Sequence, residues 1–168
     1  MRDRYTNLQI ALHWAIVLMI PIQYLTGGSI ERTHHAVHMG IEPSAWDILQ
    51  HKVHNYCGMA MGALMATRLI VRLRSERAAF PSDPIGVAAL ALHWAFYAAI
   101  ICQAALGVIA SYLTFRVAPL HVAGAWIILR MVALHVAAAF WHALINGTMS
   151  WTACCPARTK SRKNVDTC

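Results

Sequence analysis

Histidine is the residue type that stands out in this sequence. The chain has ten histidines among 168 residues, of which 58% are apolar and only 12% are charged. Six histidines lie inside long apolar stretches, where a polar ring is costly unless it faces protein groups or a bound cofactor. These six are His13, His54, His93, His121, His135 and His142. We therefore expect the chemistry of the chain to reside in its histidines.

The spacing of these histidines favours two pairs at two depths. His121 and His135 are fourteen residues apart, which on a helix places them within about 40° of one face and about 21 Å apart along the axis. His54 is expected at the level of His121, and His13 can approach the level of His135. Two neutral imidazoles fill both axial positions of a b-type haem and leave an iron suited to electron transfer. The pattern thus predicts two haems in a helix bundle.

The elements that must hold these rings are four membrane spans. A soluble domain has roughly 25% charged residues, about twice the share found here, so an ordinary soluble enzyme is excluded. Each apolar stretch exceeds the roughly 20 residues that cross a bilayer as a helix. The four stretches cover residues 7–28, 52–73, 86–113 and 120–146. We predict an all-α membrane protein: a four-helix transmembrane domain over residues 1–150 and a basic tail over 151–168.

Lysine and arginine are distributed unevenly between the two ends of the predicted spans. Ten of them lie at one set of ends and three, Arg32, Lys52 and Arg116, at the other. The ten are Arg2, Arg4, Arg68, Arg72, Arg74, Arg77, Arg158, Lys160, Arg162 and Lys163. The positive-inside rule then predicts that both termini are cytoplasmic, in a bacterial inner membrane. The net charge of +7 reflects this topology and anionic lipid, with no nucleic-acid partner expected.

Between the first two spans we expect a long, solvated outer loop over residues 29–50. It contains His34, His35 and His38, and the i,i+4 spacing of His34 and His38 leaves a metal pair as the less favoured alternative. The first span is expected to remain in the mature protein, because its apolar run is too long for a cleaved signal. We find no internal repeat.

Small residues and one arginine accompany the expected ligands. Gly58 and Gly62 follow His54, and Ala138 and Ala139 follow His135. They leave room for a flat macrocycle, or alternatively for close helix packing. Arg68 lies fourteen residues after His54, on the same face and about 21 Å further in. There it would bind haem propionates, anchor the helix at the cytoplasmic surface, or do both.

Spacing alone leaves some partners open. Depth would pair His13 with His142 as readily as with His135, because His142 lies seven residues further on nearly the same face. If His135 is the inner ligand, His93 and His142 are available for propionates or for a quinone headgroup, whose reduction needs a proton donor. His51 is the alternative outer ligand.

Four segments of the chain together resemble the bacterial cytochrome b561 family, which is related to the haem b subunits of nickel–iron hydrogenases. The matching segments are Tyr5 through His13-Trp14 to Gly27-Gly28, His54-Asn-Tyr-Cys-Gly58 with Arg68-Leu-Ile-Val-Arg72, His93-Trp-Ala-Phe-Tyr97 with Gly107, and His121 through Leu134-His135 to His142. The resemblance implies that His54 and His121 hold an outer haem and that His13 and His135 hold an inner one. It also implies exchange of electrons with ubiquinone. The segment Asn146-Gly-Thr-Met departs from the family pattern near the expected inner quinone site.

From this we predict a di-haem b cytochrome that moves single electrons between a quinone and a periplasmic-side redox protein or a small molecule such as superoxide. Its cofactors are two haems b, and its partners are ubiquinone, the lipid bilayer and a redox partner protein. One alternative is a haem-containing anchor subunit of a hydrogenase or dehydrogenase. Another is a histidine-lined metal or proton transporter without haem, which the lack of Asp or Glu within the spans disfavours.

Overall fold

The computed structural model describes residues 6–74 and 81–145, and within them four long helices form the whole architecture. These helices are α1 (Asn7–His38), α2 (Ala45–Arg74), α3 (Pro84–Tyr112) and α4 (Ala118–Ile145), with a 3-10 turn, η1 (Phe115–Val117), before α4. All four are long and apolar enough to cross a membrane. The predicted all-α, four-span fold is confirmed, whereas the tail over residues 151–168 lies outside the described residues.

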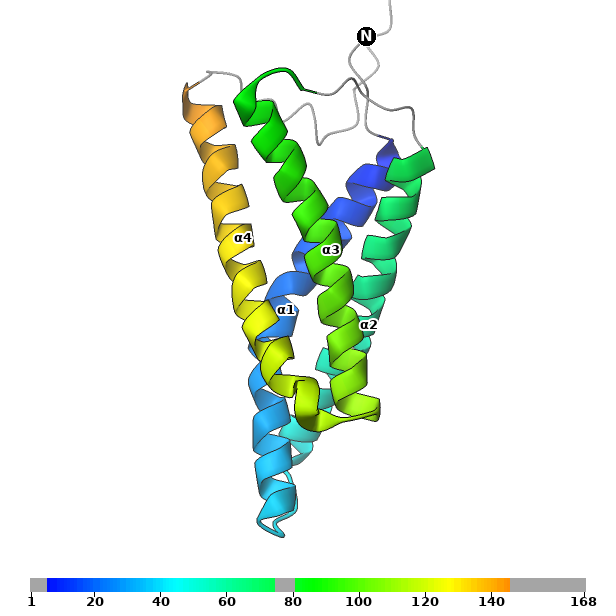
Figure 1. Ribbon diagram of the computed structural model, residues 1–168. Helices are drawn as coiled ribbons and strands as arrows, with labels where there is room; N and C mark the ends of the chain where they lie inside the picture. The colour runs from blue at the N-terminus through cyan, green and yellow to red at the C-terminus, as the bar shows by residue number, and fades with distance from the viewer. Residues whose placement is uncertain (1–5, 75–80, 146–168) are drawn as a thin grey trace, which may run out of the picture.

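The bundle has two distinct ends (Figure 1). At the loop end lie residues 39–44 and the turn that precedes α4, and at the termini end α1 begins and α4 finishes. Local capping explains two helix starts at the termini end. The Thr6 hydroxyl accepts the Gln9 N–H at 3.2 Å and the Gln9 side chain accepts the Thr6 N–H at 3.0 Å, a capping box. The Asp83 carboxylate caps α3 through the Gly86 N–H at 2.7 Å.

The expected outer loop over residues 29–50 is wrong, because both flanking helices continue into it. α1 runs to His38 and α2 starts at Ala45. The polar residues after Gly28 do not end α1, since their hydroxyls are satisfied within the helix. Ser29 donates to the Thr26 carbonyl at 2.6 Å and Thr33 to the Ser29 carbonyl at 2.7 Å. A six-residue connection remains, and Gly40 has a positive φ of 69° there.

The α1–α2 hairpin therefore extends beyond the rest of the bundle (Figure 1). At 1.5 Å per residue the 32 residues of α1 span about 48 Å, well above the roughly 30 Å of hydrocarbon in a bilayer. An ion pair joins the two helices in this projecting part, where the Arg32 Nε lies 2.7 Å from an Asp47 carboxylate oxygen. His34, His35 and His38 consequently stand on a helix.

Helix packing follows chain order, so that α1 contacts α2, α2 contacts α3 and α3 contacts α4. Among the described residues no Cα of α1 lies within 8 Å of a Cα of α4; the Tyr24 hydroxyl nevertheless donates to the Ala125 carbonyl across that side. α1 changes direction near its middle in Figure 1, where Pro21 removes a backbone hydrogen bond. The buried apolar core draws on all four helices. It consists of Ile16, Met61, Met65, Tyr97, Ile100 and Ile128.

Candidate functional site: histidines at two levels of the bundle

At the loop end the structure places His54 of α2 beside His121 of α4. We call these two residues the loop-end pair. Their ring centroids are 6.2 Å apart and their planes are 78° apart. Two imidazoles bound on opposite sides of one metal ion would have centroids roughly 6 Å apart, because each metal–nitrogen bond is about 2 Å and each nitrogen lies about 1 Å from its ring centre. The separation of the two ring centroids is thus compatible with both imidazoles binding one metal ion.

Each ring of the loop-end pair is held by a glutamine of the preceding helix. The Gln23 backbone carbonyl accepts the His54 Nδ1–H at 3.1 Å, and the Gln23 side-chain Nε2 donates to the His54 backbone carbonyl at 3.0 Å. Gln103 and His121 repeat both bonds at 3.1 Å and 2.7 Å. A carbonyl can only accept, so Nδ1 carries the hydrogen and Nε2 is the bare nitrogen that can bind a metal.

A glycine lies against each of these two rings. A Cβ added at Gly27 would lie 3.6 Å from His54 Cε1, and one added at Gly107 would lie 3.0 Å from His121 Cε1. Each glycine comes four residues after the glutamine whose carbonyl accepts the ring. On a helix, the side chain at i+4 stands beside the carbonyl of residue i. Glycine at this position therefore opens the carbonyl to the imidazole.

Sequence reasoning missed both glutamines, although a signal for them was present. Residues 13–27 read His-Trp, eight residues, Gln, three residues, Gly, and residues 93–107 read the same. The prediction that the chain has no internal repeat was therefore wrong. The structure shows its meaning, because α1 and α3 carry the same motif and α2 and α4 each place a histidine against it.

At the termini end a second group of side chains comes from all four helices. We call it the termini-end cluster, and it consists of His13, Arg68, His93 and His135. The rings of His93 and His135 are 5.5 Å apart and perpendicular, and His13 lies within electrostatic range of the other three. Arg68 donates to the Gln9 carbonyl at 2.7 Å. The fold thus brings together the four residues predicted for the inner site, while His142 is exposed near the end of α4.

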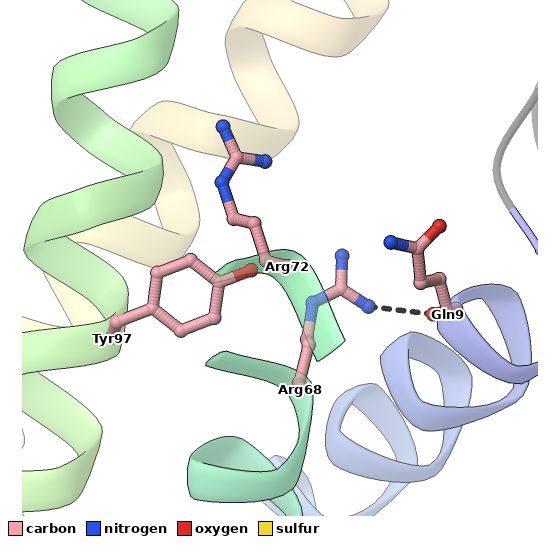
Figure 2. A pocket seen from close by; sticks show the side chains of 4 residues that line it. All are labelled: Gln9, Arg68, Arg72 and Tyr97. Carbon is pink, nitrogen blue, oxygen red and sulfur yellow. Dashed lines mark hydrogen bonds between the residues drawn. The ribbon is translucent and has the colours of Figure 1, made fainter. Parts of the chain in front are cut away.

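A small pocket next to this cluster is lined by two arginines of α2 (Figure 2). Gln9, Arg68, Arg72 and Tyr97 form its walls, and the Arg68 guanidinium points toward Gln9. The Arg72 guanidinium carbon lies 5.9 Å from the centre of the Trp94 ring, a cation–π distance. Two guanidinium groups in one place suit anionic groups such as carboxylates. The sequence predicted a part for Arg72 in the membrane orientation and in the family match, but not in this site.

Gly58 and Gly62 face protein side chains, which is the helix-packing alternative and not room for a macrocycle at these two positions. A Cβ at Gly62 would lie only 2.6 Å from the Ala104 Cβ, so this glycine serves close packing of α2 on α3. Gly58 faces the Gln23 side chain, with 3.5 Å from an added Cβ to the Gln23 Oε1. Ala138 and Ala139, by contrast, lie on the exposed surface of α4.

His51, the alternative outer ligand, lies one turn before His54 on α2 and within electrostatic range of it, but its ring faces another histidine. The His51 ring is 5.9 Å from His34, which stacks on Phe115 at 4.8 Å. Within residues 6–74 and 81–145, no group of three or more His, Cys, Asp or Glu side chains is placed to hold a metal ion. A porphyrin iron needs only two protein ligands, because the macrocycle supplies the other four. Arg130, nine residues after His121, is exposed on α4.

The fold and the adjacent imidazoles define a class, that of four-helix membrane proteins in which histidines of different helices lie side by side. Over residues 4–153 the sequence matches the family described as prokaryotic cytochrome b561. The chain belongs to this family.

Two curated relatives support the match. The chain is 32% identical over 109 residues to cytochrome b562 of Cereibacter sphaeroides. These aligned residues cover 63% of this chain and 65% of the relative. It is 29% identical over 121 residues to a protein of Yersinia pestis named probable superoxide oxidase CybB, covering 67% and 60% of the two chains. The chain thus spans less than two thirds of these relatives. Membership of a cytochrome b family implies haem b, in a multi-pass bacterial membrane protein.

Proposed function

We propose that this chain is a di-haem b electron-transfer protein that moves single electrons between a quinone and a periplasmic-side or small-molecule redox partner. The observation that carries the proposal is the loop-end pair: two rings 6.2 Å apart in facing helices, each with Nδ1 bonded to a backbone carbonyl and Nε2 available. In this proposal His54 and His121 are the axial ligands of the outer haem.

The inner haem is assigned to His13 and His135. His135 is favoured over His142 because it lies in the cluster that contains His13, His93 and Arg68. Arg68 and Arg72 would bind the propionates, whose negative charges need partners at this depth. His93 donates its Nδ1–H to the Ala89 carbonyl at 2.7 Å, which leaves Nε2 for a propionate or a quinone headgroup.

When bound, haem b supplies reversible one-electron chemistry at its iron. The protein contributes ligands, orientation and exclusion of water. Buried apolar side chains separate the two histidine levels. One of them, Met61, lies seven residues after His54 on the same helix face, about halfway to the level of Arg68. This layer keeps water from the space between the two sites.

The identity of the partners rests on weaker support and forms part of the proposal. Ubiquinone is the partner that the family resemblance implies. Superoxide is the small-molecule candidate, in keeping with the name of the Yersinia pestis relative. The surplus of Lys and Arg at the termini end supports the proposed orientation, with both termini on the cytoplasmic side of a bacterial inner membrane. The loop-end pair then lies on the periplasmic side.

The projecting hairpin favours one alternative, a haem-containing anchor subunit of a hydrogenase or dehydrogenase. Its tip exposes Val37, Met39, Ile41 and Trp46, a set of apolar side chains beyond the predicted bilayer. Copurification of a larger subunit from a native membrane, lost when Trp46 and Ile41 are changed to serine, would favour this role.

Cofactor content tests the proposal directly. The pyridine haemochrome assay on the purified full chain should give two haems b per polypeptide. A preparation with less than one haem per chain after expression with ample haem supply would contradict the proposal, and a colourless protein would favour a histidine-lined transporter. The reduced spectrum should rise in two steps during a potentiometric titration, one for each haem.

A further inference from the structure

The two glutamines contact the proposed haem ligands without being ligands themselves. We infer that Gln23 and Gln103 are positioning residues that fix the orientation and the donor strength of His54 and His121. The inference rests on the proposed function, because it assumes that these two histidines bind haem iron.

The first step is the way in which each backbone carbonyl is presented. The Gln23 and Gln103 carbonyls lie inside their helices and would normally be shielded by the side chain four residues later. Gly27 and Gly107 occupy those positions and lie under the rings. Each imidazole can therefore approach a carbonyl of the neighbouring helix, at 3.1 Å in both cases.

The second step is the return bond from each side-chain amide. Gln103 is buried, with only 9% of its surface exposed, and an amide buried at membrane depth is costly unless it is bonded. Its Nε2 donates to the His121 carbonyl at 2.7 Å, as Gln23 Nε2 does to the His54 carbonyl at 3.0 Å. Each return bond fixes the axial register of two helices, so that the carbonyl meets Nδ1.

The third step is that each glutamine side chain faces a glycine of the helix that carries its histidine, closely at Gly124 and at an ordinary contact distance at Gly58. A Cβ at Gly124 would overlap the Gln103 Oε1, and a Cβ at Gly58 would contact the Gln23 side chain at 3.5 Å. The room for each amide is therefore built by two helices. Two separate parts of the chain thus make the same arrangement, which a chance contact of a single glutamine would not explain.

The equivalence also holds along the sequence. His13, Gln23 and Gly27 recur 80 positions later as His93, Gln103 and Gly107, and the histidine that each glutamine holds recurs 67 positions later, from 54 to 121. The two glutamine–histidine contacts therefore come from equivalent places in two similar hairpins. They approach the loop-end pair from opposite partners, α1 for His54 and α3 for His121.

The chemical consequence follows from the Nδ1–H bond. A hydrogen bond from Nδ1–H to a carbonyl makes Nε2 a stronger donor and fixes the ring plane. A stronger donor stabilises the ferric state, so these bonds lower the reduction potential of the haem they serve. Removing a return bond loosens the register, weakens the Nδ1–H bond and should raise that potential.

The test uses methionine, which has nearly the length of glutamine but no amide donor. In the purified full chain, Gln23→Met and Gln103→Met should each retain two haems. Each should raise the midpoint potential of one and the same haem, the one that disappears in His121→Ala, and broaden its ferric low-spin EPR signal. Gln50→Met is the matched control, because Gln50 accepts a bond from Arg32 in the projecting hairpin and should leave both potentials unchanged.

A milder pair of variants covers the case in which the methionine proteins assemble poorly. Gln23→Asn and Gln103→Asn keep the amide on a shorter side chain and should give a smaller shift in the same direction. Unchanged potentials in all variants that retain two haems would overturn the inference. So would a shift of the other haem, or loss of both haems from the asparagine variants. If the unsubstituted chain itself bound no haem, the proposed function would fail instead.

Discussion

The two hairpins of this bundle, α1–α2 and α3–α4, are alike at one end and different at the other. At the loop end each supplies a glutamine, a glycine and a histidine with the same bonds. At the termini end His13 and His93 are still equivalent. However, the position fourteen residues after the loop-end histidine is Arg68 in α2 and His135 in α4. One half thus has an arginine where the other has a histidine.

This difference shows how one motif can serve two kinds of site. At the loop end each half gives one histidine, and the result is a symmetric pair. At the termini end the substitution of arginine for histidine leaves an unequal set, with three imidazoles and a guanidinium from four helices. A site of this kind can hold a haem and neutralise its propionates at once.

The largest effect should come from replacing His135 or Arg68, the two unequal positions, by alanine. His135→Ala should lose one haem and about half the b-type absorbance, whereas Arg68→Ala should retain both. A nearby cation favours the reduced form of a haem. Loss of the Arg68 charge should therefore lower the midpoint potential of the termini-end haem. Haem content and potentiometric titration measure both effects.

Two controls sharpen this prediction. Arg130→Ala removes a cation on the exposed surface of α4 and should leave both potentials unchanged. His142→Ala should retain two haems; if it lost one while His135→Ala did not, the inner ligand would be His142.

A medium effect is expected where the halves differ in packing. Gly124→Ala places a methyl group onto the Gln103 side chain, and such overpacking costs about 1–3 kcal/mol. Gly58→Ala makes an ordinary contact of 3.5 Å with Gln23 and should cost little. Thermal unfolding in detergent, followed by loss of the haem absorbance, compares the two variants. Equal stability of both would mean that the two glutamine cavities are equivalent after all.

The smallest effect should come from the part that only one hairpin has. Asp47→Asn breaks the ion pair with Arg32 in the projecting hairpin, and both side chains reach solvent there. Exposed ion pairs contribute little to stability. We therefore expect unchanged haem potentials and a small decrease in melting temperature. Raised salt should make the difference in melting temperature between the variant and the unsubstituted chain smaller. A shift in either potential would show that the projection is coupled to the sites.

Much of the fold could be predicted from the sequence, because membrane helices follow from length and hydropathy. The four spans and the common level of His54 and His121 needed only helical geometry and the cost of polar rings in lipid. The extent of α1 could not be predicted in this way. Its hydroxyl groups bond within the helix, so polar composition after Gly28 did not mark a helix end.

Predicting the glutamine–histidine contacts would have needed knowledge of how the helices pack. Gln23 and Gln103 are polar residues in apolar stretches, which composition alone reads as tolerated exceptions. Their meaning depends on a register between neighbouring helices that no single-helix pattern contains. The choice between the two readings of the glycines needed the same knowledge, since Gly62 packs against Ala104, as the helix-packing alternative expects. Only a comparison of the two halves of the sequence could have indicated the glutamine–histidine contacts.

The most direct test of the account is the haem content of three variants: His54→Ala, His121→Ala and the double variant. Since both residues are assigned to one iron, each of the three proteins should retain one haem per chain with the same midpoint potential. Loss of different haems in the two single variants, or loss of both haems only in the double variant, would contradict the assignment of His54 and His121 to a common haem.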